Sequence, residues 1–210
     1  MYTLADLPDT IPLFPLTGVL LFRRCKLPLV IFEPRYVAMI SDTLKSEHRL
    51  VGMIQPKADS EDDLFQIGCA GRIIQVVEVE GGRFGIILEG VSRFRLRRQV
   101  DGFVPYRRGL VRWPEFEIDL GDPETDASLN RKKFLKLFDL YCDHAGIQCN
   151  RKSLKREADD LLINAVSMGC ELTPSEKQAL LELRTLTERR AALETLLSMA
   201  LADTEAKTLQ

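Results

Sequence analysis

The sequence lacks the features that mark membrane proteins and the common enzyme classes. Its longest apolar run, Leu27–Phe32, is far shorter than the roughly 18 residues that a membrane helix needs. No Gly-Lys pair occurs, so no phosphate-binding loop of the nucleotide-binding type is present. The sequence has only two histidines, His48 and His144, and no Gly-x-Ser-x-Gly or His-Glu-x-x-His motif, so it shows no recognisable hydrolase site. We therefore predict no catalytic residues, no cofactor and no membrane partner.

Cysteine is scarce and irregularly placed. The five cysteines are odd in number, whereas disulfide frameworks have even numbers and belong to small secreted chains. The N-terminal residues also lack the basic start and apolar core of a signal peptide. We therefore expect reduced thiols in a cytoplasmic protein. Cys142, Asp143, His144 and Cys149 have a metal-like spacing, but structural zinc needs four N or S ligands. We predict no metal site, and a redox role for Cys142 and Cys149 stays open.

Neither sign of charge dominates the chain as a whole. The 29 Lys and Arg residues face 31 Asp and Glu residues, which gives a net charge of −2 and does not indicate a globally basic nucleic-acid binder. The charge is unevenly spread, because residues 1–114 carry a net charge of +3 and residues 115–210 a net charge of −5. The chain is therefore a mildly basic half followed by an acidic one.

Residues 1–114 have the pattern of a β-rich subdomain. Short apolar runs are separated by Pro and Gly, and Gly81-Gly82 is typical of a tight hairpin turn. One helix is expected after Pro34, because Tyr36, Met39 and Ile40 follow at helical spacing. Many short strands with turns between them predict a closed or nearly closed, mostly antiparallel barrel.

The second half has the pattern of a helical subdomain. Residues 115–125 are acidic and predict a linker, and residues 126–210 carry apolar side chains at helical spacing. The clearest start is Thr173-Pro174-Ser175-Glu176, which predicts one long helix beginning with a capping box. Its apolar stripe is typical of an intramolecular bundle, with a coiled-coil seam as the alternative. The fold class is therefore α+β, a β-barrel followed by a helical bundle.

One stretch of the β-rich half is strongly basic. Residues 93–112 carry a net charge of +6. Strand alternation puts Arg93, Arg95 and Arg97 on one face, and Arg107 and Arg108 follow. Such a face could bind a nucleic-acid backbone or an acidic polypeptide. The favoured interpretation is structural, a charged outer strand face with some arginines paired to the acidic half.

Several blocks, in order, resemble the N-terminal substrate-recognition domain of the Lon ATP-dependent proteases. The two most specific are Phe32-Glu33-Pro34-Arg35-Tyr36 and Glu89-Gly90-Val91-Ser92-Arg93-Phe94. Arg23-Arg24-Cys25-Lys26 stands where the family usually has a proline-glycine turn, and the chain ends at Gln210, where a full protease would continue into ATPase and peptidase domains. Further matching blocks are Ile11-Pro12-Leu13-Phe14-Pro15-Leu16, Val19-Leu20-Leu21-Phe22, Leu27-Pro28-Leu29, Gly68-Cys69-Ala70-Gly71-Arg72-Ile73 and Pro105-Tyr106.

The resemblance implies a free-standing Lon-like domain with a PUA-like barrel and no chemistry of its own. Its expected partners are unfolded or tagged proteins, or a protein-quality-control partner, and its oligomeric state is left open, a dimer included. The candidate peptide-binding residues are Phe32, Glu33, Arg35 and Tyr36. Because PUA-like barrels can bind RNA, RNA binding through residues 93–112 is the alternative function.

The same motif also has a local structural use. Pro34 sets φ at a strand-to-helix turn, and Glu33 can face the positive end of the helix and pair with Arg35. We therefore expect these residues to be scaffold first and binding site second.

Overall fold

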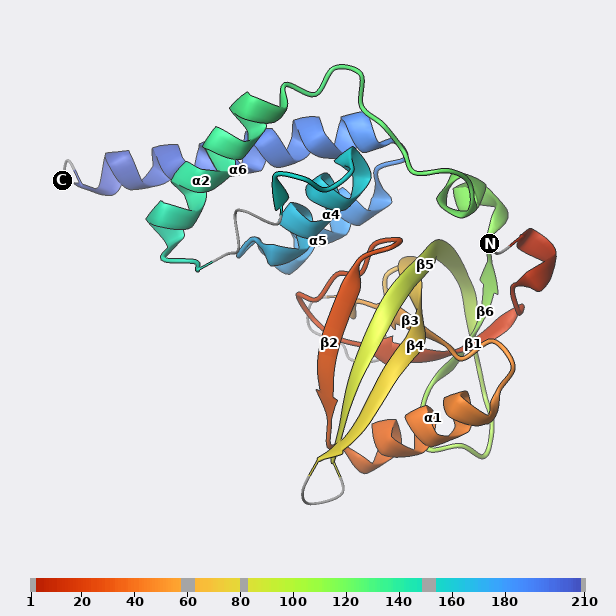
Figure 1. The fold of residues 1–210 in the computed structure, drawn as a ribbon. Helices are drawn as coiled ribbons and strands as arrows, with labels where there is room; N and C mark the ends of the chain where they lie inside the picture. The colour runs from red at the N-terminus through yellow and green to blue at the C-terminus, as the bar shows by residue number, and fades with distance from the viewer. Residues whose placement is uncertain (1–2, 58–62, 80–82, 149–153, 209–210) are drawn as a thin grey trace. The chain divides into compact units, whose positions relative to one another are not determined.

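A computed structural model describes residues 3–57, 63–79, 83–148 and 154–208. The chain folds as two compact units, Met1–Asp122 and Pro123–Gln210 (Figure 1). Within the described residues, all strands belong to the first unit, and the second unit is helical. The predicted α+β class, a mostly antiparallel barrel followed by helices, is confirmed.

The strands of the first unit close into a ring. Their order is β2-β5-β4-β3-β1-β6, and a further pairing joins β6 back to β5, so that β2 lies outside the ring against the first half of β5 (Figure 1). The β1–β3 pair is parallel and the other described pairs are antiparallel. The strands are β1 Thr10–Pro15, β2 Lys26–Ile31, β3 Leu50–Ile54, β4 Ile67–Val79, β5 Arg83–Val100 and β6 Arg108–Arg112.

Strand β5 is 18 residues long and pairs with three other strands. Its first half pairs with β2 and β4, and its second half pairs with β4 and β6. Its pairing with β6 shifts register between Leu96 and Arg98, and such bulges bend a strand as ring closure requires. The predicted Gly81-Gly82 turn lies outside the described residues, but β4 and β5, which flank it, pair antiparallel as expected.

The first unit has a close-packed apolar core. Phe94 of β5 is fully buried and meets Trp113 edge-on, with ring centroids 5.9 Å apart. Gly68 lies opposite Phe94 across the β4–β5 pair, and a Cβ there would lie 2.5 Å from the Phe94 ring. Glycine at this position therefore makes room for the aromatic ring. The buried cluster consists of Leu7, Ile11, Leu13, Leu50, Ile54, Leu64, Ala70, Phe94, Val111 and Trp113.

Three helical segments accompany the strands. The predicted helix is α1, Pro34–Lys45, which connects β2 to β3 and buries Tyr36, Met39 and Ile40 as the spacing predicted. A 3-10 helix, η1, spans Leu4–Asp6 before the first strand, and a second, η2, spans Pro114–Leu120 after the last one.

The acidic segment predicted as a linker is largely η2, which packs against β5 in the first unit. Its Asp119 is buried against Arg93 of β5, and its Glu115 pairs with Arg95 of the same strand. The division between the units falls after Asp122 rather than at the start of this segment. The acidic residues therefore neutralise part of the basic strand.

Arg23 holds the end of η2 by donating to the backbone carbonyls of Ile118, Gly121 and Asp122.

The second unit is a helical bundle built around its last helix. This helix, α6, packs against α2, α4 and α5, and its Leu193 and Leu197 are fully buried. The apolar stripe therefore belongs to an intramolecular core, as favoured above. The helices are α2 Arg131–Ala145, α4 Asp159–Gly169, α5 Pro174–Glu182 and α6 Leu186–Thr208.

The prediction of one long helix after Thr173 is wrong, because the chain breaks between α5 and α6. The Thr173–Glu176 capping box is present as predicted, with the Thr173 N–H 2.8 Å from the Glu176 carboxylate. α5 ends at Glu182, and the C-cap residue Leu183 has an extended backbone with ψ of 134°. A second Thr-x-x-Glu pair then starts α6, in which the Thr185 N–H donates to Glu188 over 3.0 Å and the Glu188 N–H donates back over 3.2 Å.

A buried carboxylate ties the start of the second unit to α6. The Asp126 side chain is 1% exposed and accepts hydrogen bonds from Ser128 and from Arg190. Burial raises the pKa of Asp126, but the hydrogen bonds from Ser128, Arg190 and Thr187 outweigh burial and lower it to about 2.

We expect Asp126 to give the second unit an acid-sensitive contribution to stability. The folded pKa of about 2 lies below the ordinary aspartate value of 3.8, so the contribution is complete above about pH 5 and is lost as the pH falls toward 2. The difference is worth about 2 kcal/mol. Urea unfolding followed by circular dichroism should show Asp126→Asn less stable than wild type by about this amount at pH 7, with a smaller gap near pH 2. Asp143→Asn, at an exposed carboxyl on α2, is the control. A gap that stays constant with pH contradicts the assignment.

Candidate functional site

The Phe32–Tyr36 motif forms the junction between β2 and α1. Glu33 is the N-cap of α1 with an extended backbone (φ −70°, ψ 131°), and Pro34 takes the first helical position. Proline favours this arrangement because it restricts the preceding residue to extended conformations and has no N–H to leave unpaired. The chain therefore turns sharply from strand to helix at Glu33.

The side chains of the motif form a stack that extends from the core to the surface. The Tyr36 ring lies 4.4 Å from the buried Phe14 ring, between centroids, and the Arg35 guanidinium lies 4.7 Å above Tyr36. Arg35 Nε and Nη2 both lie 2.9 Å from Glu33 Oε2, so the predicted pair is present. Each partner is 41% exposed, and a pair this exposed contributes about 0–1 kcal/mol. Phe32, just before it, is 66% exposed.

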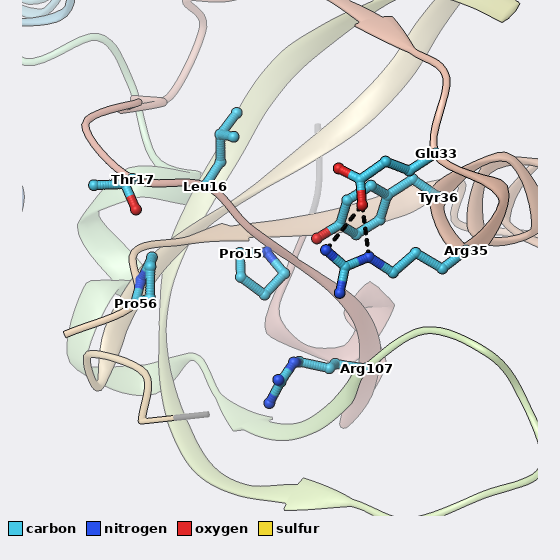
Figure 2. A pocket seen from close by; sticks show the side chains of 8 residues that line it. All are labelled: Pro15, Leu16, Thr17, Glu33, Arg35, Tyr36, Pro56 and Arg107. Atoms are coloured by element: carbon cyan, nitrogen blue, oxygen red, sulfur yellow. Dashed lines mark hydrogen bonds and ion pairs between the residues drawn. The ribbon is translucent and has the colours of Figure 1, made fainter. Parts of the chain in front are cut away.

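The motif forms one wall of a cavity of about 260 Å³. Figure 2 shows Arg35 and Arg107 coming from different segments of the chain, with Glu33 and the Tyr36 ring next to Arg35. Glu33, Arg35 and Tyr36 belong to the β2–α1 junction, and Arg107 is the residue immediately before β6. The remaining walls are apolar or weakly polar side chains of the β1 end and of the segment after β3, namely Pro15, Leu16, Thr17 and Pro56.

An exposed apolar row lies on the strands that lead to the motif. Val30 of β2 faces Gly85 of β5, which faces Val77 of β4, so the three share one side of the sheet. Val30 is 61% exposed and Val77 is 51% exposed. With Phe32, they leave three apolar side chains exposed on this part of the first unit, and exposure of such side chains does not stabilise the fold.

The predicted basic face is divided among different environments. Arg93 does not share an exposed face with its neighbours, because η2 covers it and its side chain is only 1% exposed. Arg95 donates from Nε and Nη2 to Glu115 over 2.7 and 2.8 Å. Arg97 is exposed, Arg107 lines the cavity described above, and Arg108 lines a second one.

The second cavity, of about 220 Å³, lies beside α1 and is lined by His48, Asp42 and Tyr106 among others. The Tyr106 hydroxyl donates to Asp42 over 3.0 Å. Burial raises the pKa of Tyr106, and the hydrogen bond with Asp42 raises it further, so the hydroxyl stays protonated at neutral pH. The contact fastens the β5–β6 loop to α1.

The described cysteines and histidines form no cluster suited to a metal. Within the part of the chain that the structure describes, no group of three or more His, Cys, Asp and Glu residues could hold a metal ion. Cys142 is buried, and Cys149, the other thiol of the spacing noted above, lies outside the described residues. None of the described helices is long and apolar enough to span a membrane.

A family model of the ATP-dependent protease La (LON) substrate-binding domain matches residues 10–199. The chain belongs to this family. It is 29% identical to the Lon protease of Flavobacterium johnsoniae over 199 residues, which are 91% of this chain and 24% of that protein. It is also 29% identical to the Lon protease of Parabacteroides distasonis over 189 residues, 86% of this chain and 23% of that protein. The chain therefore spans roughly a quarter of the length of these relatives.

Two solved structures share the fold of this Lon substrate-binding domain. The N-terminal domain of a Mycobacterium avium complex Lon protease superposes with a TM-score of 0.66 at 19% identity, covering 90% of this chain and 98% of that one. A Lon N-terminal domain protein from Xanthomonas campestris gives 0.61 at 21% identity, covering 90% and 97%. The predicted family is confirmed.

Sequence reasoning did not place Arg107 in this cavity. Arg107 was grouped with the basic strand, but the structure places it among the residues that line the cavity, together with Arg35. The two lie more than seventy positions apart in the sequence, and no local pattern connects them. The β1–β6 pairing, which sets Pro12 against Arg108, and the hydrogen bond from the Leu13 N–H to the Arg107 carbonyl bring this segment to β1.

Proposed function

We propose that this chain is a non-enzymatic recognition module that binds exposed segments of unfolded or tagged proteins in the cytoplasm. The observation that carries this proposal is the half-exposed Glu33–Arg35 pair on the wall of an open cavity. An ion pair contributes most to stability when its geometry is rigid and its charges are shielded from solvent. An exposed pair contributes little to stability, and its charged groups remain accessible to a binding partner. The family match supports substrate binding as the task of the domain.

The surroundings of the cavity suit an unfolded polypeptide. Such a chain offers apolar side chains that a folded protein hides, together with polar backbone. Phe32 and Val30 supply exposed apolar surface next to the motif, and the cavity supplies polar and charged side chains.

We expect Arg35→Ala to lose binding while keeping the fold. The probe is a reduced, carboxymethylated protein that cannot fold, with affinity measured by fluorescence anisotropy. Arg35→Ala should bind at least about tenfold more weakly, whereas its free energy of unfolding should fall by no more than about 1 kcal/mol. Lys45→Ala is the matched control, because Lys45 is 78% exposed on the same helix and does not line the cavity.

Two results would count against this proposal. Wild-type affinity in Arg35→Ala would remove the cavity from the binding surface. A large loss of stability in Arg35→Ala, with unchanged binding at low temperature, would make the motif scaffold alone.

RNA binding through residues 93–112 is less well supported. Arg93 and Arg95 already face Asp119 and Glu115, so two of the five predicted arginines are engaged by carboxylates. Phosphate contacts by the remaining arginines would be few, and binding would weaken steeply with salt. Tight, sequence-selective RNA binding at physiological salt would reverse this ranking.

A further inference from the structure

The second cavity, beside α1, brings a cation and an anion to one small space. Arg108 of β6 and Asp42 of α1 both line it, and no ion pair joins these two described side chains. Both act on one hydroxyl group. Burial and Asp42 raise the pKa of Tyr106, and the nearby positive charge of Arg108 opposes them. Two opposite charges therefore face the cavity around Tyr106 without pairing with each other.

The Asp42 carboxylate keeps room for a further donor. Tyr106 donates to its Oδ2 atom over 3.0 Å, and Lys45 lies 3.6 Å from its Oδ1 atom, which is longer than a hydrogen bond. A carboxylate can accept about four hydrogen bonds. The Asp42 side chain is 48% exposed, so a ligand can reach it.

Other walls of the cavity are apolar and buried. Ile11 and Leu50, which are 1% and 2% exposed, line it together with Pro8 and Pro12. Thr43 also lines it and is 2% exposed, and its hydroxyl has no hydrogen-bond partner among the described residues. A buried hydroxyl without a partner costs free energy, and a ligand in the cavity would supply that partner.

The size of the cavity limits the ligand to a small molecule. Its volume of about 220 Å³ lies below the roughly 300–1,000 Å³ of sites for drug-sized ligands. A ligand that suits it therefore has few atoms, one group of each charge and a short apolar part.

We infer that this cavity binds a free α-amino acid with a small aliphatic side chain. The ligand carboxylate contacts Arg108, whose planar guanidinium matches two carboxylate oxygens. The ligand ammonium group contacts Asp42, and the aliphatic side chain lies against the apolar walls. An α-amino acid carries both charged groups on one carbon atom, which suits two protein charges placed around the same hydroxyl. The inference goes beyond the proposed function, because this cavity shares no lining residue with the one that Arg35 lines.

Titration of isotope-labelled protein with leucine and two analogues, followed by NMR, tests this inference. Leucinamide keeps the ammonium group and lacks the carboxylate, whereas isocaproate keeps the carboxylate and lacks the ammonium group. Wild-type protein should bind leucine at least about tenfold more tightly than either analogue, because each analogue loses a hydrogen bond between charged groups.

Two variants assign the contacts. Arg108→Gln should bind leucine no more tightly than wild type binds leucinamide, and Asp42→Asn should bind it no more tightly than wild type binds isocaproate. Arg112→Gln is the control, since Arg112 is an exposed arginine of the same strand as Arg108 and lines neither cavity. If Arg108→Gln does not fold, Arg108→Lys takes its place and should weaken leucine binding, because lysine keeps the charge and loses the planar fork.

Three results would overturn the inference. They are no binding of leucine to wild type, equal affinities for leucine and both analogues, and a preference for leucine that survives in both cavity variants. None of them bears on the proposed function, which is tested separately at the cavity that Arg35 lines.

Discussion

Replacing Arg93 with alanine should destabilise the first unit by about 3–5 kcal/mol, the usual cost of leaving one partner of a buried ion pair alone. Arg93 Nε and Nη2 donate to the two carboxylate oxygens of Asp119 over 2.9 and 2.8 Å, and the Arg93 backbone N–H donates to the same carboxylate. The side chains are 1% and 3% exposed, and Phe116 lies 4.6 Å from the guanidinium. Without Arg93, a buried carboxylate loses its counter-charge and η2 loses its main attachment to β5.

Trp113 provides a clean readout of this loss. It is the only tryptophan in the chain and is buried in the core of the first unit, so its fluorescence reports the unfolding of that unit. Asp119→Ala should act in parallel with Arg93→Ala, and the double variant should lose less than the sum of the two.

Arg95→Ala is the matched control for Arg93→Ala. It removes an arginine from the same strand that contacts a carboxylate of the same segment at similar distances, 2.7 and 2.8 Å. That pair is 31% and 43% exposed, so its loss should cost no more than about 1 kcal/mol. Equal costs for the two arginines would show that burial is not what makes the Arg93 pair important.

The second large effect is expected in the helical unit, where Arg189→Met should cost about 2–4 kcal/mol. Arg189 is 2% exposed and closes the break between α5 and α6. It donates to the Leu180 carbonyl over 3.1 Å, to the Leu183 carbonyl over 3.2 Å and to the Asn164 side-chain oxygen over 2.9 Å. Methionine fills a similar space but removes the hydrogen bonds that Arg189 donates to these three acceptors.

Far-ultraviolet circular dichroism measures the second effect, because the helical signal comes mainly from the second unit. Arg184→Met, at an exposed position in the same break, is the control and should cost less than about 0.5 kcal/mol. If Arg189→Met is as stable as this control, the helix ends are satisfied without Arg189.

Much of the fold follows from local chemistry that the sequence displays. The Pro34 junction, the Thr173–Glu176 capping box and the helical spacing of Tyr36, Met39 and Ile40 each act within a few residues. The α5–α6 break also had a local signal, because Thr185 and Glu188 repeat the capping-box spacing. The apolar stripe continues across the break, and its periodicity outweighed that signal.

Only part of the candidate site could be predicted from the sequence. The motif around Glu33 and Arg35 could be recognised as a block, but its exposure could not, because exposure depends on what packs above it. Arg93 shows the opposite case. Strand alternation correctly predicted that Arg93 points away from Phe94 and the core, but η2, whose Asp119 lies twenty-six residues later, covers that outer face. Long-range pairing decides such cases, and a single sequence does not reveal it.

The central position of β5 also bears on the order in which the first unit assembles. β4 and β5 are neighbours in the chain and can pair as soon as both exist, whereas β1 must wait for β6, since Thr10 faces Leu110. Contacts between distant parts of a chain form slowly, because the intervening loop loses entropy on closing. We therefore expect the hairpin to form early and the ring to close last. During synthesis, β1 can pair with β3 before β6 exists, but its other edge has no partner strand until β6 is made. A protein proposed to bind unfolded segments therefore exposes an open strand edge of its own until translation of the first unit is complete.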